Sequence, residues 1–281
     1  VLASSFGIIE KCQLTGNSSS DTVRFITGSG GEILDSTITG GKSALLIERA
    51  SSALIGKSKA VTITGAETGI TVHGSSNVEI INTTINSNSG DGINANRNSS
   101  VYLGGDNTIT NNGGYAVRLA RGSTLSNKCS KTNNISSNSK GVFYAMWGSE
   151  ASLCNMTLSS NGVIIQAQTN STVFLTDSSI TSSSERVIDS KGGVALEIDN
   201  TSITGNSSQE AVQLNDGSNL HISGSTVSGG KAGISAVYNS TVRLQGGNTI
   251  TGNTQEGINL LNSTLHQYPD VSTTTISSNT G

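Results

Sequence analysis

One stretch of the chain combines several cations with aromatic side chains and contains no carboxylate. Residues 107–149 hold no Asp or Glu and five basic residues, Arg118, Arg121, Lys128, Lys131 and Lys140. The stretch ends in GVFYAMWGS, which contains the only tryptophan of the chain. Cations beside aromatic rings suit an acidic glycan, because the charges attract its anionic groups and the rings stack on its sugars. The candidate binding residues are Arg118, Arg121, Lys140, Phe143, Tyr144 and Trp147.

Composition narrows the classes of function. The 281 residues carry a net charge of −3, with 12% charged and 33% hydrophobic residues, and have no polybasic or polyacidic run. Nucleic acid is therefore not an expected partner. No apolar stretch reaches the roughly 18 residues that span a bilayer, so we expect no membrane span in this chain. The sequence predicts neither a metal site nor a cofactor, and we assign no catalytic residue from it.

A polar–aliphatic–polar triplet, such as the TIT centred on Ile63, recurs along the whole chain at a mean spacing of about 24 residues. Its twelve centres are Leu14, Ile38, Ile63, Ile85, Ile109, Ile135, Leu158, Ile180, Ile203, Val227, Ile250 and Ile276. Most periods carry two further short segments that alternate with period two, such as AVRL at 116–119 and SVYL at 100–103. Three short strands per period, without helical periodicity, predict an all-β parallel β-helix. We expect about twelve coils in one domain, residues 1–281, or a fragment of a longer solenoid.

Asparagine marks the same corner of most coils, three residues after the triplet centre. Eight coils have it there: Asn17, Asn88, Asn112, Asn138, Asn161, Asn206, Asn253 and Asn279. Asn tolerates positive φ at a tight corner, and stacked amides form hydrogen-bonded ladders. We expect these residues to turn the corner and not to form a binding site.

The middle strand of each coil suggests an exposed apolar pair. If Val117, Val142 and Val163 point inward, the residues that follow them point outward. These outward residues are Arg118, Phe143 and Ile164. An exposed Phe–Ile pair predicts a contact patch. The alternative is that a loop of the same chain covers this apolar pair. For the basic segment 107–149, the alternative is a solvated face with its aromatic side chains packed beneath a turn.

The phrases NTITNNGGYAVRL at 107–119 and NTITGNTQEGINL at 248–260, with their ten weaker copies, resemble the right-handed parallel β-helix repeats of the pectate-lyase-like superfamily. This resemblance covers the chain and implies the architecture and a secreted location. The fold carries lyases, glycosidases, tailspikes and surface adhesins alike, so it does not fix the function. Hydrolases of the superfamily show NTD, DD and GHG motifs, but this chain has no DD or GHG and reads NTI in place of NTD. Asp177, Asp199 and Asp216 lie on nearby coils, although nothing in the sequence places them in one column.

We therefore favour a non-enzymatic extracellular or cell-surface protein, structural or adhesive, that binds polysaccharide or self-associates end to end or side by side. The chain begins at Val1 without a signal-like segment, which leaves open a leader that has been cut away. One alternative is a lyase or glycosidase acting on acidic glycans, with Arg118, Arg121, Lys140 or Tyr144 meeting the substrate. A second alternative is an ice-binding protein that uses the outward Thr-x-Thr positions of the triplets, although exposed strand positions favour Thr in any case.

Overall fold

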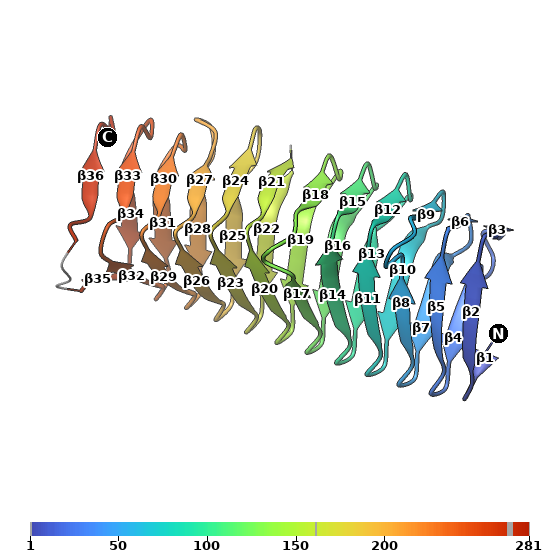
Figure 1. Cartoon of the computed structure of the whole chain (residues 1–281). Coiled ribbons are helices and arrows are strands. Elements are labelled where there is room, and N and C mark those ends of the chain that lie inside the picture. The colour runs from blue at the N-terminus through green and yellow to red at the C-terminus, as the bar shows by residue number, and fades with distance from the viewer. Residues whose placement is uncertain (1, 161, 269–271, 281) are drawn as a thin grey trace. The chain divides into compact units, whose positions relative to one another are not determined.

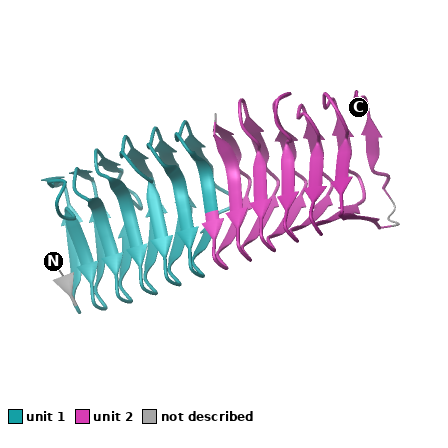
Figure 2. Ribbon diagram, turned by 180° about the vertical axis from the view of Figure 1, so that it is seen from behind, with its two compact units in different colours: residues 1–144 teal, residues 145–281 magenta. Residues whose placement is uncertain are grey.

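The computed structural model describes residues 2–160, 162–268 and 272–280, and it consists of short strands joined by tight turns (Figure 1). No helix occurs in these ranges. The chain divides into two compact units, Val1–Tyr144 and Ala145–Gly281 (Figure 2). In each unit the chain passes in turn through three parallel sheets, here named A, B and C, and one such passage is one coil. The prediction of a single domain over residues 1–281 stays a prediction.

Unit 1 contains the first strands of each sheet. Sheet A contains β1 (Leu2–Ala3), β4 (Val23–Ile26), β7 (Ser43–Glu48), β10 (Thr68–His73), β13 (Ile93–Asn96) and β16 (Tyr115–Ala120). Sheet B contains β2 (Phe6–Glu10), β5 (Gly30–Leu34), β8 (Ser52–Ile55), β11 (Asn77–Ile81), β14 (Ser100–Gly105) and β17 (Thr124–Asn127). Sheet C contains β3 (Gln13–Thr15), β6 (Ser36–Thr39), β9 (Val61–Thr64), β12 (Thr83–Asn86), β15 (Asn107–Thr110) and β18 (Asn133–Ser136). Strand β19 (Gly141–Met146) includes residues of both units.

Unit 2 repeats the same order. Sheet A contains β22 (Val163–Gln168), β25 (Ile188–Lys191), β28 (Val212–Asn215), β31 (Ile234–Val237) and β34 (Ile258–Leu261). Sheet B contains β20 (Glu150–Cys154), β23 (Thr172–Thr176), β26 (Ala195–Asp199), β29 (Asn219–Ser223), β32 (Thr241–Gln245) and β35 (Thr264–Gln267). Sheet C contains β21 (Thr157–Ser160), β24 (Ser179–Ser182), β27 (Ser202–Thr204), β30 (Thr226–Ser228), β33 (Thr249–Thr251) and β36 (Thr275–Ser277).

Like residues stack on like residues along each column. The triplet centres Ile63, Ile85 and Ile109 pair in register on neighbouring strands of sheet C, and all three are fully buried. Their flanking polar residues point outward, as the alternating burial of each strand shows. Because a β-branched side chain packs well on a pleated surface, the repeat builds a continuous apolar interior one coil at a time. The predicted all-β parallel β-helix, with three short strands per coil of about 24 residues, is confirmed.

The predicted exposure of Phe143 and Ile164 is wrong. Phe143 is 2% exposed and Ile164 is fully buried, although the residue before Phe143, Val142, is buried as well. Two consecutive residues are also buried in β16, where Ala116 and Val117 precede the half-exposed Arg118. The corner that enters sheet A turns one extra side chain into the core, so period two begins one residue later than the sequence suggested. In β19 the outward position is therefore Tyr144.

Asparagine ladders form where the asparagines are consecutive. Asn88 donates from Nδ2 to Oδ1 of Asn112 at 2.9 Å, and Asn112 donates in the same way to Asn138 at 2.8 Å. Asn253 and Asn279 form a similar pair in unit 2. Asn17 and Asn206 form no such amide pair, because the next coil has glycine at this position, Gly41 and Gly230 respectively. Oδ1 of each accepts a local backbone N–H, and Nδ2 of Asn206 donates to the carbonyl oxygen of Glu185. Asn161 lies outside the described residues.

The positive φ at this corner falls one residue before the expected position. Ser87, Asn111 and Ser137 have φ values of 53°, 56° and 55°, and each precedes a ladder asparagine. The preceding residue thus makes the turn, and the asparagine itself points into the core. A buried serine ladder at another corner was not predicted. In unit 1 the hydroxyl of each serine accepts the backbone N–H of the serine one coil earlier, through Ser29, Ser51, Ser76, Ser99 and Ser123.

Candidate functional site

Two of the predicted binding residues meet on the outer face of sheet A in unit 1. The guanidinium carbon of Arg118 lies 5.5 Å from the centroid of the Tyr144 ring, and that ring lies 5.0 Å from the ring of Tyr115. On its other side, Nη1 of Arg118 is 3.8 Å from Oδ2 of Asp91. A cation between a carboxylate and an aromatic face is stabilised by both.

Asp91 ties this cluster to the backbone. Its Oδ1 accepts the backbone N–H of Tyr115 at 2.8 Å, and its side chain is 12% exposed. Burial raises the pKa of the Asp91 carboxyl, while the N–H of Tyr115 and the charge of Arg118 act in the opposite direction. Burial also raises the pKa of the Tyr144 phenol. The cluster satisfies its own charges, which is typical of a structural contact between coils.

The other predicted residues do not join this cluster. Arg121 is exposed on a turn with a φ of 53°, and Lys140 is exposed just before β19. Phe143 belongs to the core. Trp147, in unit 2, is 49% exposed on a turn with a φ of 55°. Binding by the exposed members of this set stays a prediction.

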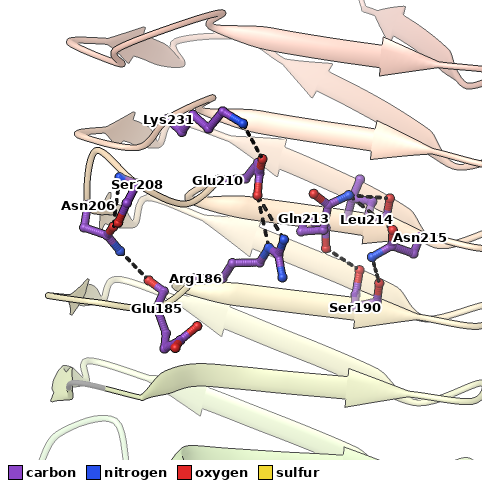
Figure 3. A network of polar contacts seen from close by, with 10 residues as sticks. All are labelled: Glu185, Arg186, Ser190, Asn206, Ser208, Glu210, Gln213, Leu214, Asn215 and Lys231. Carbon is purple, nitrogen blue, oxygen red and sulfur yellow. Dashed lines mark hydrogen bonds and ion pairs between the residues drawn. The ribbon is translucent and has the colours of Figure 1, made fainter.

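In unit 2, the segments that lead into strands β25, β28 and β31 of sheet A carry charges that pair with one another (Figure 3). Arg186 donates to Oε2 of Glu210 from Nε at 3.2 Å and from Nη2 at 3.1 Å, and Lys231 approaches the other oxygen of that carboxylate at 4.0 Å. Nearby, the Gln213 side chain lies almost fully buried beside Asn215. The cations Arg186 and Lys231 are therefore compensated within the chain, as Arg118 is in unit 1.

The outer face of sheet B in unit 1 is different, because it forms an open groove of about 460 Å³. One row of outward side chains runs along it in register on successive strands: Ile8, Glu32, Leu54, Glu79, Tyr102 and Ser126. Phe6 also lines the groove, from the neighbouring outward row. We call this surface the sheet B groove.

Aromatic rings stand toward the two ends of the sheet B groove. Phe6 is 65% exposed and Tyr102 is 36% exposed, and they belong to strands four coils apart, about 19 Å at the spacing of paired strands. Phe6 lies over Gly30, where a Cβ atom would stand 3.2 Å from the ring. Because Gly30 has no side chain, the ring of Phe6 can pack directly on this part of the sheet. Between the rings, the carboxylates of Glu32 and Glu79 flank Leu54.

The sequence contained a signal for part of this groove. The segments NVEI at 77–80 and SVYL at 100–103 alternate clearly, and their outward positions are Glu79 and Tyr102. The alternation of these two segments places both residues on one surface. Phe6 and Ile8 had no such signal, because FGIIE does not alternate polar and apolar residues.

Outward threonines of sheet C also align. Thr37, Thr62, Thr84 and Thr108 form one row in unit 1 and are half-buried. Asn134 continues that row, and Asn86 interrupts the parallel row on the other side of the triplet centres. The array that ice binding would use is therefore mixed in composition.

The chain belongs to the family of right-handed β-helix proteins, because the model for the "Right handed beta helix region" matches residues 1–158 and 145–281. Among solved structures, the chain is similar to the "Crystal structure of Agl-KA catalytic domain", with a TM-score of 0.51 and 12% sequence identity. That match covers 97% of this chain and 61% of the other, and at this identity it shows the fold alone. No curated protein matches the sequence.

Two further properties concern the described residues. In residues 2–160, 162–268 and 272–280, no helix has the length and hydropathy needed to cross a membrane. The same ranges contain no group of three or more His, Cys, Asp or Glu side chains arranged to hold a metal ion. Asp177 and Asp199 do not share a column, since Asp199 pairs with Thr176 of the preceding coil.

Proposed function

We propose that this protein is an extracellular or cell-surface carbohydrate-binding β-helix whose sheet B groove holds one extended glycan chain. The observation that carries the proposal is the in-register row from Glu32 to Tyr102, which lines an open groove, whereas Arg118 on sheet A is paired with Asp91. Aromatic faces stack on sugar rings, and carboxylates accept hydrogen bonds from sugar hydroxyls. The secreted location rests on the family resemblance.

The regular spacing of the groove favours a polymer. Paired strands repeat every 4.8 Å or so, and a chain laid along the groove meets a similar backbone pattern at every coil. The exposed Glu79 and the half-buried Glu32 also favour a neutral or amino sugar, because like charges at close range repel an acidic one. This differs from the acidic glycan suggested by the cations of residues 107–149.

The test is binding of the whole chain to a panel of soluble neutral polysaccharides by affinity electrophoresis. Tyr102→Ala should weaken retention by the preferred glycan about five- to tenfold, the equivalent of one aromatic contact. Tyr238→Ala is the matched control, because Tyr238 is a 55% exposed tyrosine in unit 2. Equal retention of the Tyr102→Ala variant and the parent protein would overturn the proposal.

Hydrolysis of the bound glycan is a second candidate, supported by the placement of Glu32 and Glu79. The two residues share one outward column on strands two coils apart, so their backbones are about 9.6 Å apart. From that spacing the side chains can bring their carboxyl groups to the roughly 6.5–9.5 Å of inverting glycosidases. Release of reducing ends that disappears in Glu79→Gln, with binding retained, supports this candidate. Binding without any release supports the non-enzymatic one. Self-association stays a prediction, which sedimentation over a wide concentration range tests.

A further inference from the structure

The outer face of sheet B in unit 2 has a different chemistry from the sheet B groove. Its central outward row runs in register through Ser152, Phe174, Glu197, His221, Arg243 and His266. The last three lie on consecutive strands, β29, β32 and β35, and we call them the basic column. Successive members are separated by the spacing of paired strands, about 4.8 Å.

Arg243 is the centre of the basic column. Every ion pair among the described residues of unit 2 uses Arg186, Lys191 or Lys231, so Arg243 has none there. The guanidinium is planar, permanently charged and carries five N–H donors. In the segment before β25, in contrast, Arg186 has its charge compensated by Glu210. Arg243 is thus a half-buried cation available to an external anion.

The surrounding side chains shape one side of this cation. Nε2 of His221 lies 2.8 Å from Oε1 of Gln245, which stands in the next outward row beside Arg243. The ring of Tyr268 meets the His221 ring edge to face, with 6.4 Å between centroids. His221 is therefore held in place by two contacts, and Tyr268 adds a 47% exposed aromatic surface next to the column.

We propose that the basic column is an anion site that binds the oxyanion groups, sulfate or carboxylate, of an acidic polysaccharide. Arg243 receives one oxyanion through its planar fork, and the imidazole of His266 supplies a donor on one side. His221, whose Nε2 donates to Gln245, borders the site on the other side. Tyr268 offers a face for a sugar ring. Glu197, one coil before His221, limits the site by repelling an anion placed over it. Because the net charge of the chain is −3, overall attraction does not supply this binding, and the site must be local.

This site is independent of the proposed function. The basic column lies in unit 2 and uses none of the residues of the sheet B groove. It binds an anionic polysaccharide, whereas the groove favours a neutral or amino sugar. Loss of binding in Tyr102→Ala concerns the groove alone, and loss in Arg243→Gln concerns the basic column alone.

Three polymers with one backbone test the proposal: dextran, carboxymethyl dextran and dextran sulfate. We expect the full chain to bind at least one of the two charged polymers, to ignore dextran at this site, and to bind more weakly as salt is raised. Arg243→Gln should weaken this binding at least about tenfold, because it removes a charge-assisted hydrogen bond. Binding to dextran sulfate alone assigns the site to sulfate esters, and binding to carboxymethyl dextran alone assigns it to carboxylates. Binding to both shows that the site takes either oxyanion.

The matched control is Arg97→Gln, which removes the same charge from an exposed turn of unit 1. Unchanged circular dichroism and melting temperature show that both variants are folded. Arg243→Lys keeps the charge but loses the fork, and it should bind between the parent and the glutamine variant. Equal losses in Arg97→Gln and Arg243→Gln, or no binding of either charged polymer, would overturn the proposal.

Discussion

Arg118 and Tyr144 meet on the outer face of sheet A in unit 1, with 5.5 Å between the guanidinium carbon and the ring centroid. They are 26 residues apart in the sequence, one coil of the solenoid. The same arginine approaches Asp91, one coil earlier, at 3.8 Å. Three successive coils are thus joined by one cation. Arg118 and Tyr144 therefore form a contact that supports the fold, and we place carbohydrate binding on sheet B.

The buried Asp91 should give stability a particular dependence on pH. A carboxyl whose pKa is raised in the folded state binds its proton more tightly there than in the unfolded chain. The free energy of unfolding should therefore fall as pH rises from 3.8 through the raised pKa. Asp91→Asn keeps an oxygen for the N–H of Tyr115 and should remove this part of the slope. Urea denaturation at a series of pH values measures it, with the half-exposed Asp106→Asn as control. An unchanged slope in Asp91→Asn would contradict this assignment.

The asparagine ladder should contribute strongly to stability at its centre. Asn112 is fully buried, donates to Oδ1 of Asn138 and accepts from Nδ2 of Asn88. Asn112→Ala leaves buried polar groups without partners and should lower the free energy of unfolding by about 3 kcal/mol. Asn17→Ala, at the same corner of an earlier coil, is exposed and should cost less than about 1 kcal/mol. Equal costs for the two variants, measured in urea, would show that the ladder has no special role.

Substitutions at the inward and outward positions of one triplet should differ sharply in their effect on the free energy of unfolding. Ile109 is fully buried, and Ile109→Ala should lower the free energy of unfolding by about 2–5 kcal/mol through a cavity between coils. The adjacent Thr108 points outward, and Thr108→Ala should change it by less than about 0.5 kcal/mol. Differential scanning calorimetry of the two variants checks the alternation directly. A larger loss in Thr108→Ala than in Ile109→Ala would require the opposite orientation of β15.

Ice binding should be absent. The outward rows of sheet C contain Asn86 and Asn134 among the threonines of unit 1, so the surface is not a uniform hydroxyl array. We expect the melting and freezing points of a protein solution to coincide apart from the colligative depression. A clear thermal hysteresis that disappears in Thr108→Ala would restore the ice-binding alternative and set sheet C above sheet B as the functional face.

The repeat determined most of what could be predicted from the sequence. Period two and the recurring triplets were enough for the fold, the length of a coil and the inward position of residues such as Ile85, because every coil obeys the same geometry. The corners were harder. The turn into sheet A buries both Val142 and Phe143, and the corner after the triplet places its positive φ on Asn111 and its ladder amide on Asn112.

The binding surfaces were harder still to predict from the sequence, because their chemistry depends on which outward side chains stack across coils. Glu32 and Tyr102 are 70 residues apart in the sequence yet share one row. The run of cations around Arg118 was prominent in the sequence, but its partner Asp91 lay outside the segment that drew attention. A local excess of one charge therefore says little about a solenoid face until its register is known.

Hydroxyl-radical footprinting with the preferred neutral oligosaccharide tests the central claim most directly, since it reports the exposure of individual aromatic side chains. We expect Phe6 and Tyr102 to become protected on binding, whereas Trp147 and Tyr238 keep their reactivity. Protection of Trp147 or Tyr144, with Phe6 and Tyr102 unaffected, would contradict the sheet B groove and return the binding site to the basic segment.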